Sequence, residues 1–119
     1  MNNLKNIGRI IFAIPFGVFG LMHFMNAGMM AGMVPAWVPG GVFWVYIIGL
    51  ALIAAALGLI TKKYIYHAAF LLAVLMFVFV LTIHLPAIMG GNQMAMSGLL
   101  KDFALGGGAL LIAGLFKED

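Results

Sequence analysis

Two histidines and one aspartate are the side chains of this sequence most suited to chemistry, because each lies near one end of a long apolar run. His23 lies near the end of the first run, His84 near the end of the third, and Asp102 about one turn into the fourth. Ionisable side chains are rare within membrane-spanning helices and commonly mark functional sites there. A histidine and a carboxylate can bond and protonate the oxygens of a quinone head. These residues are therefore the first candidates for a cofactor site.

The same two histidines also allow a metal site. Imidazoles from two helices at similar depth can ligate a haem iron from both sides. Methionine thioethers together with imidazole would instead suit Cu(I), and most of the ten methionines lie in or beside residues 26–41 and 86–97. No ligand spacing is specific for either metal, so His23 and His84 are metal ligands only as an alternative to quinone contacts.

Each candidate also has a purely structural explanation. The histidines can bond backbone carbonyls or lipid headgroups. Asp102 can interact with the positive N-terminus of its own helix, and methionines commonly fill packing gaps.

The composition indicates which elements must position these residues. Of the 119 residues, 66% are hydrophobic and 8% are charged, whereas a soluble domain carries about a quarter charged residues. A membrane span needs roughly 20 apolar residues, and unpaired backbone groups are costly in lipid, so spans are helical. We predict an all-α integral membrane four-helix bundle, a single transmembrane domain over residues 1–119. The predicted spans are residues 4–25, 42–60, 64–85 and 98–116.

Basic residues predict the orientation of these spans. Lysine and arginine collect on the cytoplasmic side of membrane proteins. The opposite side of this chain carries Lys101 alone. The side that includes both termini carries Lys5, Arg9, Lys62, Lys63 and Lys117. We therefore expect both termini in the cytoplasm.

The antiparallel order brings the candidate residues to one depth. His23, His84 and Asp102 should all lie at the outer level, within about one turn, or 5 Å, of one another along the membrane normal. Polar groups at that depth gain by facing the bundle instead of lipid. The uncharged segment that follows the first span is too apolar to extend into water. We expect it to cover the bundle mouth and to bring Trp37 and Asn26 to the same pocket.

Small residues predict where the helices approach one another. Alanine and glycine pairs four residues apart let backbones pack closely in lipid. We expect such contacts through Ala51 and Ala55 in the second span and through Ala104 and Gly108 in the fourth. Arg9 is expected to snorkel from the first span to the lipid headgroups.

Several segments resemble a known family. GVFGLMHFMN, MVPAWVPGG, YIIGLAL with its KK turn, IHLP and LLKDFALGGGALLIAG are similar to segments of the DoxX family of small four-helix membrane proteins, over residues 9–114. The resemblance implies a bacterial inner-membrane protein related to a subunit of a terminal quinol oxidase and thiosulfate:quinone oxidoreductase system. Many members carry a glutamate in the second span, where this chain has an apolar stretch at residues 50–53. A proton relay through that position is therefore not expected here.

Three function classes remain open on these observations. The first is a quinone-linked redox subunit, catalytic or not, that has no redox centre of its own and works with a redox partner protein or as a homo-oligomer. The second is a haem- or copper-binding membrane protein. The third is a purely structural accessory subunit of a larger membrane complex.

Other classes are disfavoured. The sparse basic residues form no patch interleaved with aromatics, so we expect the lipid bilayer and no nucleic acid as a partner. The chain has no cysteine, so it cannot by itself pass electrons from thiols to quinones. Small four-helix exporters rely on a membrane-embedded acid, and the first three spans contain none.

Reporter fusions test the predicted orientation. Reporters placed at Lys117 and at Gly91 should report opposite compartments, with Lys117 cytoplasmic, because the basic residues collect on that face. The same compartment for both positions would refute the four-span arrangement.

Overall fold

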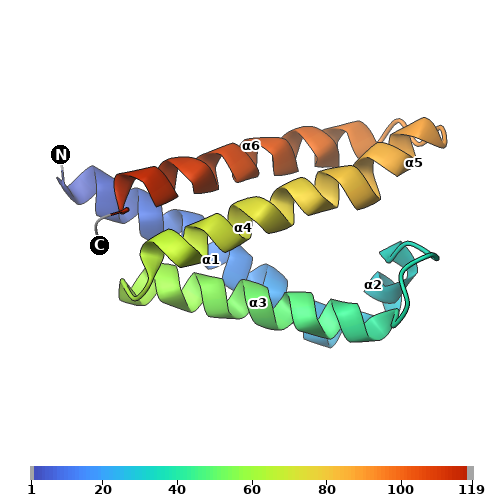
Figure 1. Ribbon diagram of the computed structural model, residues 1–119, viewed down its shortest axis with the longest axis horizontal. Helices are drawn as coiled ribbons and strands as arrows, with labels where there is room; N and C mark the ends of the chain where they lie inside the picture. The colour runs from blue at the N-terminus through green and yellow to red at the C-terminus, as the bar shows by residue number, and fades with distance from the viewer. Residues whose placement is uncertain (1, 118–119) are drawn as a thin grey trace.

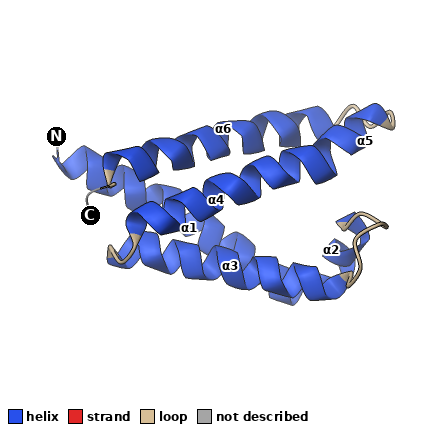
Figure 2. Cartoon of the chain, viewed as in Figure 1, coloured by secondary structure: helices blue, strands red, loops and turns tan. Residues whose placement is uncertain are grey.

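The computed structural model describes residues 2–117, which form helices and loops with no β-strand in that range. Figure 2 shows the helices joined by short loops, and the predicted all-α class is confirmed. The elements are α1 (Asn2–Met25), α2 (Ala27–Met30), η1 (Ala31–Met33), α3 (Val42–Thr61), α4 (Ile65–Phe79), η2 (Val80–His84), α5 (Leu85–Met89) and α6 (Ala95–Leu115).

Four helical segments are long and apolar enough to cross a membrane, which indicates a multi-pass membrane protein. They are Asn3–Met25, Val42–Thr61, Ile65–Met89 and Ala95–Leu115. The predicted spans agree with them closely, except that the third runs about one turn further. Pro86 does not end that span because it lies in the first turn of α5, where a missing N–H breaks few helical hydrogen bonds.

The long helices form two closely packed pairs, α1 with α3 and α4 with α6. Both termini lie at the same end of the molecule as the turn between α3 and α4 (Figure 1), and we call this the terminal end. The short helices α2 and α5 lie at the opposite end, the loop end. The two pairs contact each other through α3 and α4 and diverge toward the loop end, as Figure 1 shows.

Glycines allow the close approach within each pair. A Cβ added to Gly49 in α3 would lie 2.6 Å from the Cβ of His23 and 3.0 Å from the carbonyl oxygen of Gly20 in α1. In the second pair, the ring of Phe77 covers Gly106, where an added Cβ would lie 2.8 Å from the ring. These distances are too short for any side chain larger than hydrogen.

The predicted small-residue contacts are correct for α3 and for Gly108 of α6, and wrong for Ala104. Ala55 is buried and Ala51 is half-buried, whereas Ala104 is exposed. Gly108 is half-buried and contacts Phe12 of α1, with its added Cβ at 3.4 Å. A spacing of four residues occurs on several faces of an alanine- and glycine-rich helix, so the spacing alone does not show which face packs. The buried small residues of α6 are Gly106, Ala109 and Ala113.

The hydrophobic core lies toward the terminal end. Its buried residues come from the second half of α3, from α4 and from the last turns of α6, together with Ala13 and Phe16 near the middle of α1. The largest fully buried side chains are Leu52, Leu59, Ile65, Leu72 and Met76. The loop half of the bundle is therefore less completely filled by side chains.

The sequence predicted that Arg9 extends outward to lipid headgroups, but the side chain is buried. Its side chain is inside the bundle, with a residue exposure of 4%. The guanidinium donates to the carbonyl of Leu59 and, at 3.3 Å, to that of Ile60. These carbonyls are at the C-terminal end of α3, where the last turn has no helical partners and a cation is favourable. Arg9 therefore joins α1 to α3 at the terminal end.

Alanine substitutions at two glycines should differ in their effect on stability. Gly49→Ala should destabilise the protein by about 1–3 kcal/mol, because the new methyl group overlaps His23 and Gly20. Gly107→Ala is the matched control: no atom outside its own helix lies within 4 Å of its added Cβ, so it should be neutral or slightly stabilising. Equilibrium unfolding in mixed detergent micelles measures both, and equal stability of the two variants would contradict the observed α1–α3 contact.

Candidate functional site

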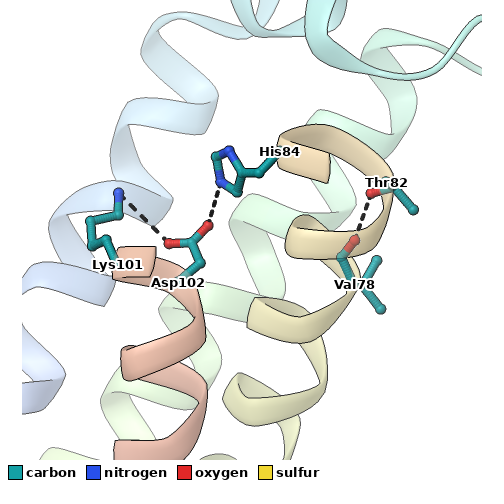
Figure 3. A network of polar contacts seen from close by, with 5 residues as sticks. All are labelled: Val78, Thr82, His84, Lys101 and Asp102. Carbon is teal, nitrogen blue, oxygen red and sulfur yellow. Dashed lines mark hydrogen bonds and ion pairs between the residues drawn. The ribbon is translucent and has the colours of Figure 1, made fainter. Parts of the chain in front are cut away.

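A π-helical turn, η2, determines where His84 lies. The backbone N–H of Leu85 donates to the carbonyl of Val80, five residues earlier. Pro86 follows immediately and has no N–H, so the ordinary helical bond to Thr82 cannot form. The Thr82 hydroxyl donates to the carbonyl of Val78 at 2.7 Å (Figure 3), a side-chain hydrogen bond that joins the widened turn to the end of α4. π-turns of this kind are frequent at functional sites.

His84 forms a hydrogen bond across the α4–α6 pair. Its Nε2 lies 2.7 Å from Oδ2 of Asp102, and both side chains are largely buried. Because a carboxylate oxygen only accepts, Nε2 carries the hydrogen in this bond. The Nζ of Lys101 lies 3.7 Å from the other oxygen, Oδ1, on a mostly exposed side chain. Figure 3 shows His84 and Lys101 on opposite sides of the Asp102 carboxylate.

Gly98 makes room for the His84 ring. A Cβ at Gly98 would lie 2.8 Å from Cε1 and 2.9 Å from Nδ1 of His84. Gly98 and Asp102 are four residues apart and therefore lie on the same face of α6. One face of α6 thus makes room for the His84 ring at Gly98 and accepts its hydrogen bond at Asp102.

His23 is positioned by its own helix and by α3. Its Nδ1 lies 2.8 Å from the carbonyl oxygen of Phe19, so Nδ1 carries a hydrogen and donates it. Its Cβ rests against Gly49, and its ring meets that of Phe19 edge to face. The residue is buried. Nε2 is the ring nitrogen that remains for a ligand.

A cavity of about 680 Å³ lies between the two helix pairs. Its polar lining residues are His23, His84, Lys101 and Asp102, all from the loop-end parts of their helices. The rest of its lining is apolar: Ile11, Phe12, Pro15, Phe16, Phe19, Met30, Met33, Val34, Val45, Ile48, Met76, Phe79, Ile83 and Leu105. The cavity thus has one polar end and a long apolar remainder.

The structure brings three of the predicted site residues together. His23, His84 and Asp102 line the same cavity, as predicted from their depth. Trp37 and Asn26 are not among the cavity-lining residues: Trp37 is 77% exposed, and Asn26 is half-buried. The segment that carries Trp37 does reach the cavity, through Met30, Met33 and Val34. Those residues precede the tryptophan, which the chain turns outward.

The geometry distinguishes the two histidines as metal ligands. His23 donates from Nδ1 to a carbonyl, an arrangement common for histidines that bind metal through Nε2. His84 uses Nε2 for Asp102, and its Nδ1 edge lies against Gly98, which leaves little room for an ion. Within residues 2–117, no group of three or more histidine, cysteine, aspartate or glutamate side chains is arranged to hold a metal. Haem or copper ligation by His23 and His84 stays a prediction.

Gly98 was not identified from the sequence, although a signal was present. A glycine one turn before a membrane aspartate leaves an open patch on the face that carries the carboxylate. A ring from a neighbouring helix can occupy that patch, as His84 does.

One protein family matches most of the chain. The family described as Domain of unknown function (DUF8561) matches residues 12–105, which include all the cavity-lining residues except Ile11. No curated protein and no solved structure shows a significant match. The family description names no activity, and the DoxX resemblance stays a prediction.

A double-mutant cycle tests the contact between Gly98 and His84. Gly98→Ala should destabilise the protein by about 1–3 kcal/mol, because its methyl group displaces the His84 ring from Asp102. In a His84→Ala background the same substitution should have little effect, since the ring is absent. Unfolding in mixed micelles measures the cycle, with Gly114→Ala as a control that meets no neighbour within 4 Å. Equal effects in both backgrounds would show that the ring does not pack on Gly98.

Proposed function

We propose that this chain, which belongs to the DUF8561 family, is a multi-pass protein of the bacterial inner membrane that binds a quinone head in the cavity between its helix pairs. The observation that carries the proposal is the separation of polar and apolar lining. The four polar side chains gather at one end, and every other lining residue is apolar. A quinone has the same division between an oxygen-bearing head and an apolar tail.

The size and chemistry of the cavity support this ligand. Sites for small molecules commonly measure about 300–1,000 Å³ and combine an apolar lining with a few polar groups. The volume here, about 680 Å³, falls within that range. Phenylalanine rings such as Phe16 and Phe19 offer flat apolar contacts. Lys101 can donate to a head oxygen, and His23 and Asp102 can accept from a head hydroxyl.

The proposed role is that of a subunit, because electrons must come from elsewhere. The chain has no cysteine, and we propose that a redox partner protein exchanges electrons with the bound quinone. The distribution of lysine and arginine supports an orientation with both termini in the cytoplasm, which puts the cavity at the outer level of the membrane. The resemblance to the DoxX family supports the same assignment.

The two alternative functions receive less support. A haem or Cu(I) site would need a second ligand besides His23. The Nδ1 edge of His84 lies against Gly98, which leaves little room for a metal there. A purely structural subunit would gain little from the His84–Asp102 pair, because apolar residues often replace a buried pair without loss of stability.

Extraction of the purified protein tests the proposal. Protein taken from membranes in mild detergent should carry quinone that organic solvent releases, detected by its ultraviolet spectrum and mass. The double variant His84→Phe/Asp102→Leu should carry several-fold less while remaining folded, because both partners are removed and no charge is left unpaired. His67→Phe is the matched control, since His67 is exposed at the other end of α4.

The same sample separates the alternatives. A Soret band would indicate haem, and copper in elemental analysis would indicate a copper site. Wild-type protein without quinone in any preparation, or a double variant that retains it fully, would contradict the proposal.

A further inference from the structure

We infer that the cavity selects the reduced, hydroxyl-bearing form of its ligand, a quinol, over the oxidised quinone. This inference rests on the proposed function and concerns the direction of the hydrogen bonds that the polar end offers. A quinone oxygen only accepts hydrogen bonds, whereas each hydroxyl of a quinol can donate one.

His23 offers an acceptor. Its Nδ1 is committed as a donor to the carbonyl of Phe19, at 2.8 Å. In the neutral ring, the other nitrogen, Nε2, then carries a lone pair and no hydrogen. Nε2 receives no hydrogen bond from any residue in the range 2–117, so it is available to a hydroxyl in the cavity.

Asp102 offers a second acceptor. Its Oδ2 is used by Nε2 of His84 at 2.7 Å. Its Oδ1 accepts no hydrogen bond within the described residues and forms an ion pair with Nζ of Lys101 at 3.7 Å. Asp102 is buried, so a hydroxyl that reaches Oδ1 forms a charge-assisted bond shielded from water.

The donors at the polar end are fewer. Each histidine has one ring N–H whose partner the geometry fixes. The N–H of His23 donates to the carbonyl of Phe19, and the N–H of His84 donates to Asp102, so neither is free for a ligand. Lys101 is the remaining side-chain donor among the described polar lining residues, and its side chain is 64% exposed. A quinone carbonyl near Oδ1 of Asp102 or Nε2 of His23 would bring its oxygen lone pair against another lone pair. A quinol hydroxyl in either place satisfies both groups.

Binding of a matched pair of ligands tests the inference. The probes are decylubiquinol, kept reduced without oxygen, and decylubiquinone, titrated calorimetrically into the protein in phosphatidylcholine nanodiscs. Empty nanodiscs correct for partition into lipid. The quinol should bind about tenfold more tightly, which corresponds to about 1.4 kcal/mol.

A third ligand tests the hydrogen bonds without altering the protein. The dimethyl ether of decylubiquinol has the ring of the quinol and no donor. The ether should bind no more tightly than the quinone, because it offers no hydrogen-bond donor to Nε2 of His23 or to Oδ1 of Asp102.

Two variants locate the selectivity. Asp102→Asn lets the amide oxygen accept from His84 and presents an N–H₂ group where Oδ1 stood, so the preference for quinol should fall to roughly twofold or less. His23→Phe keeps an aromatic ring and removes the acceptor, and should also weaken the preference. His67→Phe, at the other end of α4, should keep the tenfold ratio.

The outcomes separate this inference from the proposed function. Tighter binding of the quinol, lost in Asp102→Asn and weakened in His23→Phe, supports the inference. Equal or tighter binding of the quinone overturns it while the quinone site stands. Tight binding of the dimethyl ether, or full selectivity in both variants, also overturns it. Binding of neither ligand overturns both the inference and the proposed function.

Discussion

Close packing against glycine is the constraint on which the rest of the structure depends. Gly20 against Gly49 holds α1 to α3, and Gly106 under Phe77 holds α4 to α6. Association in lipid relies on such packing because apolar side chains gain little by leaving lipid for protein. With each pair held tightly, contact between the pairs is concentrated where the short turn at the terminal end joins them. The cavity at the other end follows from two pairs that diverge.

Polar groups in the spans are satisfied mostly within their own helices. The hydroxyls of Thr61 and Thr82 and the Nδ1 of His23 bond carbonyls four residues earlier. Among residues 2–117, the one side-chain-to-side-chain hydrogen bond between two helices is His84–Asp102. A bundle can be stable without such a bond, and a buried pair is weak evidence for stability. Its position on the wall of the cavity therefore supports the proposed ligand.

The level of a residue along the bundle could be predicted from the sequence, and its direction around each helix could not. A helix rises by a constant amount per residue, so counting placed His23, His84 and Asp102 at one level. Which face packs depends on the partner, which is why Ala104 was predicted at a contact and is exposed. The prediction that Arg9 faces lipid headgroups was wrong. Its actual partners, the carbonyls of Leu59 and Ile60, belong to a distant part of the chain, so nothing near Arg9 in the sequence indicated them. Trp37 lies in a segment without periodicity, so nothing indicated that it points outward.

The shape of the cavity adds a further constraint on the proposed ligand. Its lining along α1 extends from His23 back to Ile11, about 12 residues, or a rise of about 18 Å. A quinone head alone would fill only the polar end of such a length, and the remainder has apolar walls suited to an isoprenoid tail. Ile11 is 62% exposed, so this lower part of the cavity borders the exposed surface of α1. The proposed quinone would enter from the bilayer along this path and arrive with its head toward the loop end.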